Sequence, residues 1–142
     1  MKVLLSIKPE FVEKIFSEEK KYEYRKIIFK QKVESVVIYS TMPEGKIVGE
    51  FSIDQILIND PDSIWELTNR YSGITHNFFK QYFNNKDSAY AIKIGEVERY
   101  EEPIDPKEFD FPFTAPQSFF YVDNDFRPIS QKADFLESVL FE

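Results

Sequence analysis

The segment Lys20-Lys21-Tyr22-Glu23-Tyr24-Arg25 holds one carboxylate among three cations. In an extended chain, alternate side chains point to opposite faces, so Glu23 and Arg25 share a face with Lys21. Lys20 and the two tyrosines then lie on the other face. Cations beside a carboxylate can hold a phosphate, position a base or assist proton transfer. The same pattern also arises where an ion pair only stabilises a strand, so both interpretations stay open.

The charge of the chain is distributed unevenly. The net charge is −7, but residues 1–50 carry +2, residues 51–100 carry −2 and residues 101–142 carry −7. The stretch from Lys20 to Lys32 alone carries +5. Such asymmetry indicates a basic surface that can meet a phosphate, and it equally fits a solvated lysine-rich loop or strand edge.

Composition excludes several classes of chemistry. The chain has no Cys and one His, which removes thiol nucleophiles, disulfides, Cys-ligated zinc and His-cluster metal sites. We therefore expect no metal and no cofactor, and we expect His76 to be an ordinary exposed residue. No run approaches the ~20 apolar residues of a membrane span, and the N-terminus is too short for a secretory signal. The expectation is one soluble, cytoplasmic protein with no membrane partner.

The hydrophobic pattern predicts an α+β fold with a mainly antiparallel sheet. The predicted strands cover residues 3–7, 36–39, 46–58, 88–100 and 118–122, with extended structure at 22–29 and a bulge at Gly95. Helices are predicted from Lys8 to Ser17, from Asn59 to Gly73, from Thr75 to Asn84 and from Ser130 to Phe141. Closure of the sheet into a small barrel would remove its exposed edges.

One group of motifs resembles the start of an ASCH domain, the activating signal cointegrator homology domain of the PUA-like superfamily. The group comprises Leu5-Ser6-Ile7-Lys8, a helix ending at Ser17, and Lys20-x-x-Glu23-x-Arg25. The family signature is Gly-x-Lys-x-x-Glu-x-Arg, and this chain has Glu18 where the family usually has Gly. The turn at residue 18 must therefore form without a residue that favours positive φ.

The resemblance continues along the chain in the same order as in the family. It includes Val36-Val37-Ile38-Tyr39-Ser40-Thr41, Gly45 to Phe51, Trp65, Tyr71-Ser72-Gly73-Ile74, Tyr82-Phe83, Ala89 to Ile92 and Ala115 to Phe119. We thus expect an ASCH domain over residues 1–122, with an acidic C-terminal extension over 123–142. A similar arrangement occurs in small prokaryotic ASCH proteins described as predicted transcriptional regulators.

The resemblance implies a PUA-like β-barrel with a cleft suited to RNA or a modified nucleoside. The residues it places at that cleft are Ser6, Lys8, Lys20, Tyr22, Glu23, Arg25, Tyr39, Ser40, Gln117 and Ser118. An aromatic ring such as that of Tyr22 or Tyr39 would stack on a base. Most of the fifteen Phe are expected to be core residues.

Two other functions stay open. Some similar proteins are ribonucleases or acetylcytidine amidohydrolases, and in the latter a Lys, a Thr and a Glu are catalytic. Lys20 matches that Lys, Glu23 replaces the Thr, and Glu66 is a loose counterpart of the third residue. If the protein is an enzyme, Lys20, Glu23 and Arg25 are the expected catalytic residues, with Glu23 as base. The third possibility is a protein-interaction module that binds a partner through the acidic tail.

Overall fold

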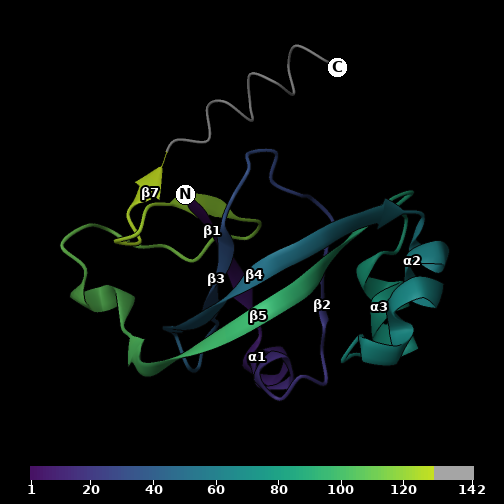
Figure 1. The fold of residues 1–142 in the computed structure, drawn as a ribbon, viewed down its shortest axis with the longest axis horizontal. Coiled ribbons are helices and arrows are strands. Elements are labelled where there is room, and N and C mark those ends of the chain that lie inside the picture. Colours follow the sequence, from purple (N-terminus) through teal and green to yellow (C-terminus); the bar gives the residue numbers. More distant parts are fainter. Residues whose placement is uncertain (130–142) are drawn as a thin grey trace, which may run out of the picture.

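The computed structural model describes residues 1–129, which form one sheet flanked by short helices (Figure 1). The strands are β1 (Lys2–Ile7), β2 (Tyr22–Arg25), β3 (Ser35–Ser40), β4 (Lys46–Asn59), β5 (Ala89–Ile104), β6 (Phe120–Val122) and β7 (Pro128–Ile129). The helices are α1 (Pro9–Phe16), α2 (Pro61–Thr68) and α3 (His76–Tyr82), with 3-10 turns at Asn69–Tyr71 and Pro106–Glu108. The predicted α+β class is confirmed. The helix predicted for residues 130–141 lies outside the described residues.

The sheet has the strand order β2-β5-β4-β3-β1-β6-β7. Only the β1–β3 pair is parallel, and every other neighbouring pair is antiparallel, as expected from the sequence. The long strands β4 and β5 form a twisted ribbon across the molecule (Figure 1). Within residues 1–129 the two outermost strands, β2 and β7, do not pair with each other, so backbone hydrogen bonds do not close the barrel.

The central strands β1 and β3 are buried on both faces, which explains their continuous apolar runs. On one face, Leu5 and Ile38 pack with Val12 and Ile15 of α1. On the opposite face, Leu4, Val37 and Val122 form a separate cluster with aromatic residues of the chain after β5. The segment that follows β2 differs from the prediction, because the strand ends at Arg25 and residues 26–34 form a loop.

Helices α2 and α3 are both inserted in the connection between β4 and β5. The Asp60 side chain caps α2 by accepting from Ser63 N at 3.0 Å, and Thr75 caps α3 by accepting from Phe78 N at 3.1 Å. These are the starts that the sequence predicts. The buried side chains Ile64 and Phe79 pack against Tyr24, which brings α3 beside β2. No helix within residues 1–129 combines the length and apolar character needed to cross a membrane.

Two backbone features follow the sequence pattern. Glu18 has a φ of 67°, a left-handed conformation, in the turn between α1 and β2. The extra residue at Gly95 is confirmed as a bulge, because Phe51 pairs with Val97 while Ile53 pairs with Ile94. A Cβ at Gly95 would lie 2.5 Å from Ser52 Oγ, so the close approach there requires glycine.

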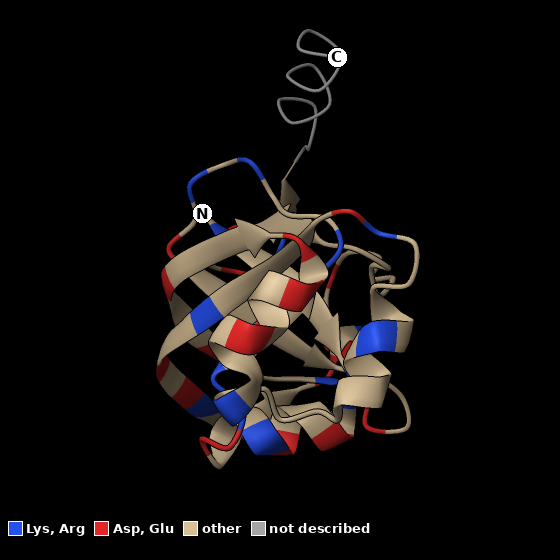
Figure 2. Cartoon of the chain, turned by 90° about the vertical axis from the view of Figure 1, so that its right-hand side faces the viewer, with Lys and Arg blue, Asp and Glu red and all other residues tan. Residues whose placement is uncertain are grey.

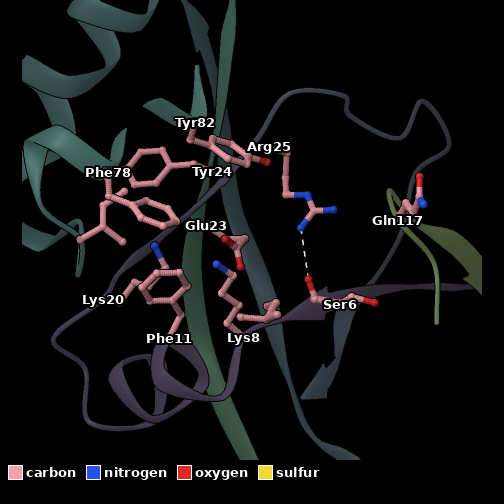
Figure 3. Close-up of a pocket in the computed structure, with 12 residues that line it drawn as sticks. Ser6, Lys8, Phe11, Lys20, Glu23, Tyr24, Arg25, Phe78, Tyr82 and Gln117 are labelled. Carbon is pink, nitrogen blue, oxygen red and sulfur yellow. Dashed lines mark hydrogen bonds between the residues drawn. The ribbon is translucent and has the colours of Figure 1, made fainter. Parts of the chain in front are cut away.

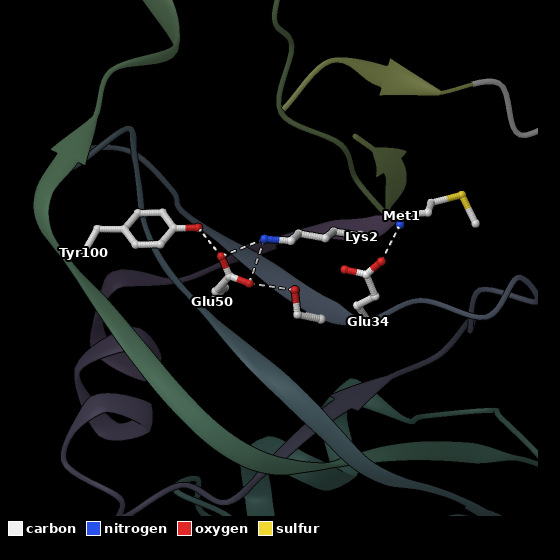
Figure 4. A network of polar contacts seen from close by, with 6 residues as sticks. Met1, Lys2, Glu34, Glu50 and Tyr100 are labelled. Atoms are coloured by element: carbon white, nitrogen blue, oxygen red, sulfur yellow. Dashed lines mark hydrogen bonds and ion pairs between the residues drawn. The ribbon is translucent and has the colours of Figure 1, made fainter. Parts of the chain in front are cut away.

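A polar network joins four strands on the side of the sheet away from α2 and α3 (Figure 4). The Glu50 carboxylate accepts from Lys2 Nζ at 3.0 Å, from Ser35 Oγ at 2.7 Å and from Tyr100 Oη at 2.7 Å. These residues come from β4, β1, β3 and β5, respectively. All three donors are directed at the Glu50 carboxylate, so these hydrogen bonds cross-link the four strands.

Candidate ligand-binding cavity

A cavity of about 340 Å³ opens between β1, β2, α1 and α3 (Figure 3). Its volume lies at the small end of the ~300–1,000 Å³ typical of ligand sites, so it suits one small ligand. Its polar lining residues are Ser6, Lys8, Lys20, Glu23, Arg25 and Gln117, and its apolar ones are Ile7, Phe11, Tyr24, Ile74, Phe78 and Tyr82. Six side chains that the sequence predicts for a cleft are thus brought together.

Lys20 is almost fully buried, with 2% of its surface exposed. Its ammonium lies 4.8 Å from the centroid of the Tyr24 ring and 5.5 Å from that of Phe11, and it donates to Ser72 O at 2.9 Å. Burial lowers the pKa of Lys20 from its ordinary value of 10.5, while the charge of Glu23 opposes that decrease. The lysine amine is therefore held in the wall of the cavity by one backbone acceptor and two aromatic rings.

Glu23 is the most unusual group in the cavity. It lies on β2 opposite Ile92 and is only 7% exposed. Its Oε2 atom is enclosed and has no hydrogen-bond partner among the described residues. A buried carboxylate oxygen without a donor is costly, so its place in a cavity points to a donor that a ligand supplies.

Arg25 forms the opposite wall and connects the two margins of the curled sheet. Its guanidinium donates from Nη2 to Ser118 O at 2.6 Å and from Nη1 to Ser6 O at 3.4 Å. These contacts tie β2 to β1 and to the segment before β6, where no strand pairing exists. Ser6 is held in turn, because its hydroxyl donates to Pro116 O at 2.9 Å.

Aromatic rings line the rest of the cavity. Phe78 and Tyr82 are one helical turn apart on α3, so they present one face to the cavity, whereas Phe79 and Phe83 lie in the core. Lys8 Nζ lies 5.3 Å from the Phe78 centroid, which places a cation at the rim. Burial raises the pKa of Tyr82, and the nearby Arg25 charge counteracts part of that increase.

Four of the predicted ligand-binding residues do not line this cavity. Tyr22 packs in the cluster between β2 and α3. Tyr39 stands 5.2 Å from the Phe113 ring and lines a different hollow, and the adjacent Ser40 is fully buried. Ser118 contributes only its backbone carbonyl, to Arg25.

Two further residues lie away from the position that the pattern predicts. Lys21 was expected beside Glu23 and Arg25, but it precedes the strand, and its ammonium lies 4.6 Å from the Tyr71 centroid. Glu66 is exposed on α2 and does not line the cavity. His76 is exposed, as predicted, and stacks on Trp65 at 4.7 Å. Among residues 1–129 no group of three or more His, Cys, Asp or Glu is placed to hold a metal ion.

The cavity residues missed by sequence reasoning are Phe11, Tyr24, Phe78 and Tyr82 and the aliphatic Ile7 and Ile74. In the sequence, Phe78 and Tyr82 are simply apolar residues of the helix predicted from Thr75 to Asn84. The sequence does contain a pattern that could have identified them, because Phe78 and Tyr82 are four residues apart, as are Phe79 and Phe83. That spacing indicates two different aromatic faces on one short helix.

Comparison with known proteins places the chain in a family. Residues 1–111 match the family described as Domain of unknown function (DUF365). The chain belongs to the DUF365 family. The crystal structure of ASCH from Zymomonas mobilis superposes with a TM-score of 0.80 at 22% identity, covering 96% of this chain and 94% of that one. This DUF365 protein therefore has the ASCH fold, and the predicted PUA-like architecture is confirmed.

Curated relatives match most of this DUF365 chain. An ASCH domain-containing ribonuclease from Zymomonas mobilis is 26% identical over 126 residues, covering 84% of this chain and 82% of that protein. A protein of Ureaplasma parvum named ATP synthase subunit alpha is 30% identical over 121 residues, and one named large ribosomal subunit protein uL22 is 29% identical. The chain spans only 15% and 39% of the length of these two proteins.

Proposed function

We propose that this DUF365 protein binds RNA and takes one unstacked nucleotide into the cavity. The observation that carries the proposal is the Glu23 carboxylate, which lines a cavity walled by aromatic rings and whose enclosed Oε2 has no donor among residues 1–129. Base–aromatic stacking contributes ~1–3 kcal/mol per base in single-strand binders. The name of the Zymomonas mobilis ribonuclease supports an RNA-related role for this fold.

The charge pattern favours a short single-stranded ligand over a duplex. On the side of the molecule drawn in Figure 2, basic and acidic residues are interspersed rather than gathered into one basic face. The exposed cations beside the cavity are Lys8 and Lys26, and each lies over an aromatic ring of α3. A nucleotide in the cavity would place its flanking phosphates near these two ammonium groups.

Binding is measured by fluorescence anisotropy of labelled single-stranded RNA over a range of salt concentrations. Replacement of Lys8 with alanine should weaken binding and reduce the log–log salt slope by about 0.7, the value for one phosphate contact on a single strand. Lys80→Ala, an exposed lysine on α3 outside the cavity, is the matched control. Unchanged affinity and slope in Lys8→Ala would contradict the proposed site.

The same geometry favours one alternative, hydrolysis of RNA. Glu23 is enclosed beside Lys20, and burial lowers the pKa of that lysine, which makes it a better proton donor. In this scheme the carboxylate takes the 2′-hydroxyl proton, the 2′ oxygen attacks phosphorus, and the lysine protonates the departing 5′ oxygen. The products would be a 2′,3′-cyclic phosphate and a 5′-hydroxyl end.

Product analysis separates binding from hydrolysis. If the protein is a ribonuclease, cyclic-phosphate ends accumulate with the unaltered protein and disappear in Glu23→Gln, while RNA binding persists. RNA that stays intact through prolonged incubation would leave binding as the function. Acetylated cytidine, tested in parallel for release of acetate, covers the amidohydrolase alternative. The interaction module proposed from the acidic tail rests largely on residues beyond 129, outside the described part of the chain.

A further inference from the structure

We infer that the cavity selects a base edge with two adjacent N–H donors, which among the common bases is guanine. This inference rests on the proposed function and names the nucleotide that enters the cavity. A carboxylate is an acceptor only, and its two oxygens can each receive a hydrogen bond. The Glu23 carboxylate lines the cavity, and Oε2 receives no hydrogen bond from the described residues.

The hydrogen bonds made by the cations near Glu23 lead to other groups. Lys20 Nζ donates to Ser72 O, and the Arg25 guanidinium donates to the carbonyls of Ser6 and Ser118. The Lys8 ammonium lies over the Phe78 ring at the rim. None of these printed hydrogen bonds is made to Glu23, so a donor on a ligand in the cavity can bind its carboxylate.

The four bases differ in what they offer a carboxylate. Guanine presents N1–H and the N2 amino group side by side, so both carboxylate oxygens receive a donor. Adenine and cytosine present one amino group beside a ring nitrogen that is an acceptor, and uracil presents one N–H between two carbonyls. Each of these three would hold a lone pair against a carboxylate oxygen, which is electrostatically repulsive.

The remaining walls fit a planar heterocycle with a polar outer edge. Phe11, Tyr24, Phe78 and Tyr82 supply aromatic surface around the carboxylate (Figure 3). The positive charges of Lys20 and Lys8 compensate the Glu23 charge and favour the electron-rich O6 side of guanine. A carboxylate held among cations and rings thus complements guanine, whereas a neutral amide at residue 23 would not.

Anisotropy with the pentanucleotides UUXUU tests the inference, where X is guanine, inosine, adenine, cytosine, uracil or an abasic site. Guanine should bind roughly tenfold to a hundredfold more tightly than adenine, cytosine or uracil, as for one good bidentate base contact. Inosine, which lacks the N2 amino group, should lie between guanine and adenine. Titration with free GMP shows whether guanine is recognised outside RNA. Binding of GMP supports a free nucleotide as the ligand. Binding of UUGUU without binding of GMP supports RNA as the ligand, recognised through the same edge of guanine.

Two variants make the outcome decisive. In Glu23→Gln the side chain offers one acceptor and one donor, so the preference for guanine should disappear while the RNA still binds. Glu66→Gln, an exposed acid-to-amide change on α2, should keep the preference. Equal affinity for all four bases, each tighter than the abasic strand, would overturn guanine selection and leave the proposed RNA binding intact. No difference between any base and the abasic site would overturn both.

Discussion

Replacement of Glu18 with glycine is expected to raise the free energy of unfolding by about 0.5–1 kcal/mol. The φ of Glu18 is 67°, and a left-handed conformation costs a residue with a side chain roughly 1–2 kcal/mol. Glycine relieves that cost but loses about 0.5–1 kcal/mol through its greater freedom in the unfolded chain. The Glu18 side chain is exposed, so its removal sacrifices little packing.

The turn that contains Glu18 also positions the buried Lys20. A second variant near that lysine, Gly73→Ala, serves as the control for Glu18→Gly. Two residues after the left-handed Glu18, Lys20 N donates to Lys14 O at 3.0 Å. Gly73, whose φ is 69°, lies against the Lys20 stem, and a Cβ there would approach Lys20 Cβ to 2.6 Å. Gly73→Ala should therefore destabilise the protein, through both backbone strain and contact with the lysine.

Urea unfolding followed by Trp65 fluorescence and circular dichroism measures both variants. With m values of about 1–3 kcal/mol/M, Glu18→Gly should move the midpoint upward by several tenths of a molar unit without changing the slope. The melting temperature should rise by about 2–4 °C. A midpoint that is unchanged or lower, at constant slope, would refute the claim that this left-handed residue is strained.

Three further outcomes are expected. Tyr24→Phe should cost about 0.5–1.5 kcal/mol at neutral pH because the Tyr24–Thr68 hydrogen bond of 2.7 Å is lost. Burial raises the pKa of Tyr24 above its ordinary 10.0, so the neutral phenol stabilises the fold below pH 10 and this stability is lost as the pH rises above 10. Unfolding curves of Tyr24→Phe should therefore show less destabilisation in alkali than those of the unaltered protein. Burial alone would raise the pKa of Glu50, but hydrogen bonds from Ser35, Tyr100 and Lys2 outweigh burial and lower that pKa. The ionised carboxylate therefore stabilises the fold above pH 4.5, and this stability should be lost as the pH falls below that value. Thermal melts of Glu50→Gln should not show this loss of stability in acid. Gly49→Ala should lower the melting temperature, because the new Cβ would lie 2.4 Å from Glu98 O and 2.9 Å from Phe16 Cζ.

Local sequence pattern predicts much of the sheet because the strands are defined by short-range signals. The alternation from Lys46 to Ile58 and the glycine at 95 correspond to a long strand and a bulge that the structure contains. Alternation correctly predicts that Glu23 and Arg25 share a face, but it places Lys20 and Tyr24 on the other face, and both of them line the same cavity. Lys20 reaches the cavity because it lies in the turn before β2, so the family resemblance predicts its position and local alternation does not.

The sequence is less informative where tertiary packing decides which face of an element is free. Tyr39 is the last residue of the strand predicted over residues 36–39, and Ser40 follows it. Both belong to β3, a central strand with both faces covered, so neither side chain reaches the cavity. Phe78 and Phe79 are adjacent and chemically identical, yet only Phe79 is in the core. That choice depends on how α3 docks on β2, which no local pattern encodes.

The position of α2 and α3 has a consequence for how this fold can diversify. Ile74, Phe78 and Tyr82 reach the cavity from the connection between two strands, whereas Glu23 and Arg25 belong to the sheet itself. Connections tolerate insertion and replacement far better than paired strands. The wall of the cavity that the connection forms can therefore vary while the carboxylate and the arginine of the sheet stay in place. Relatives with a different connection would accept a different ligand over the same two groups.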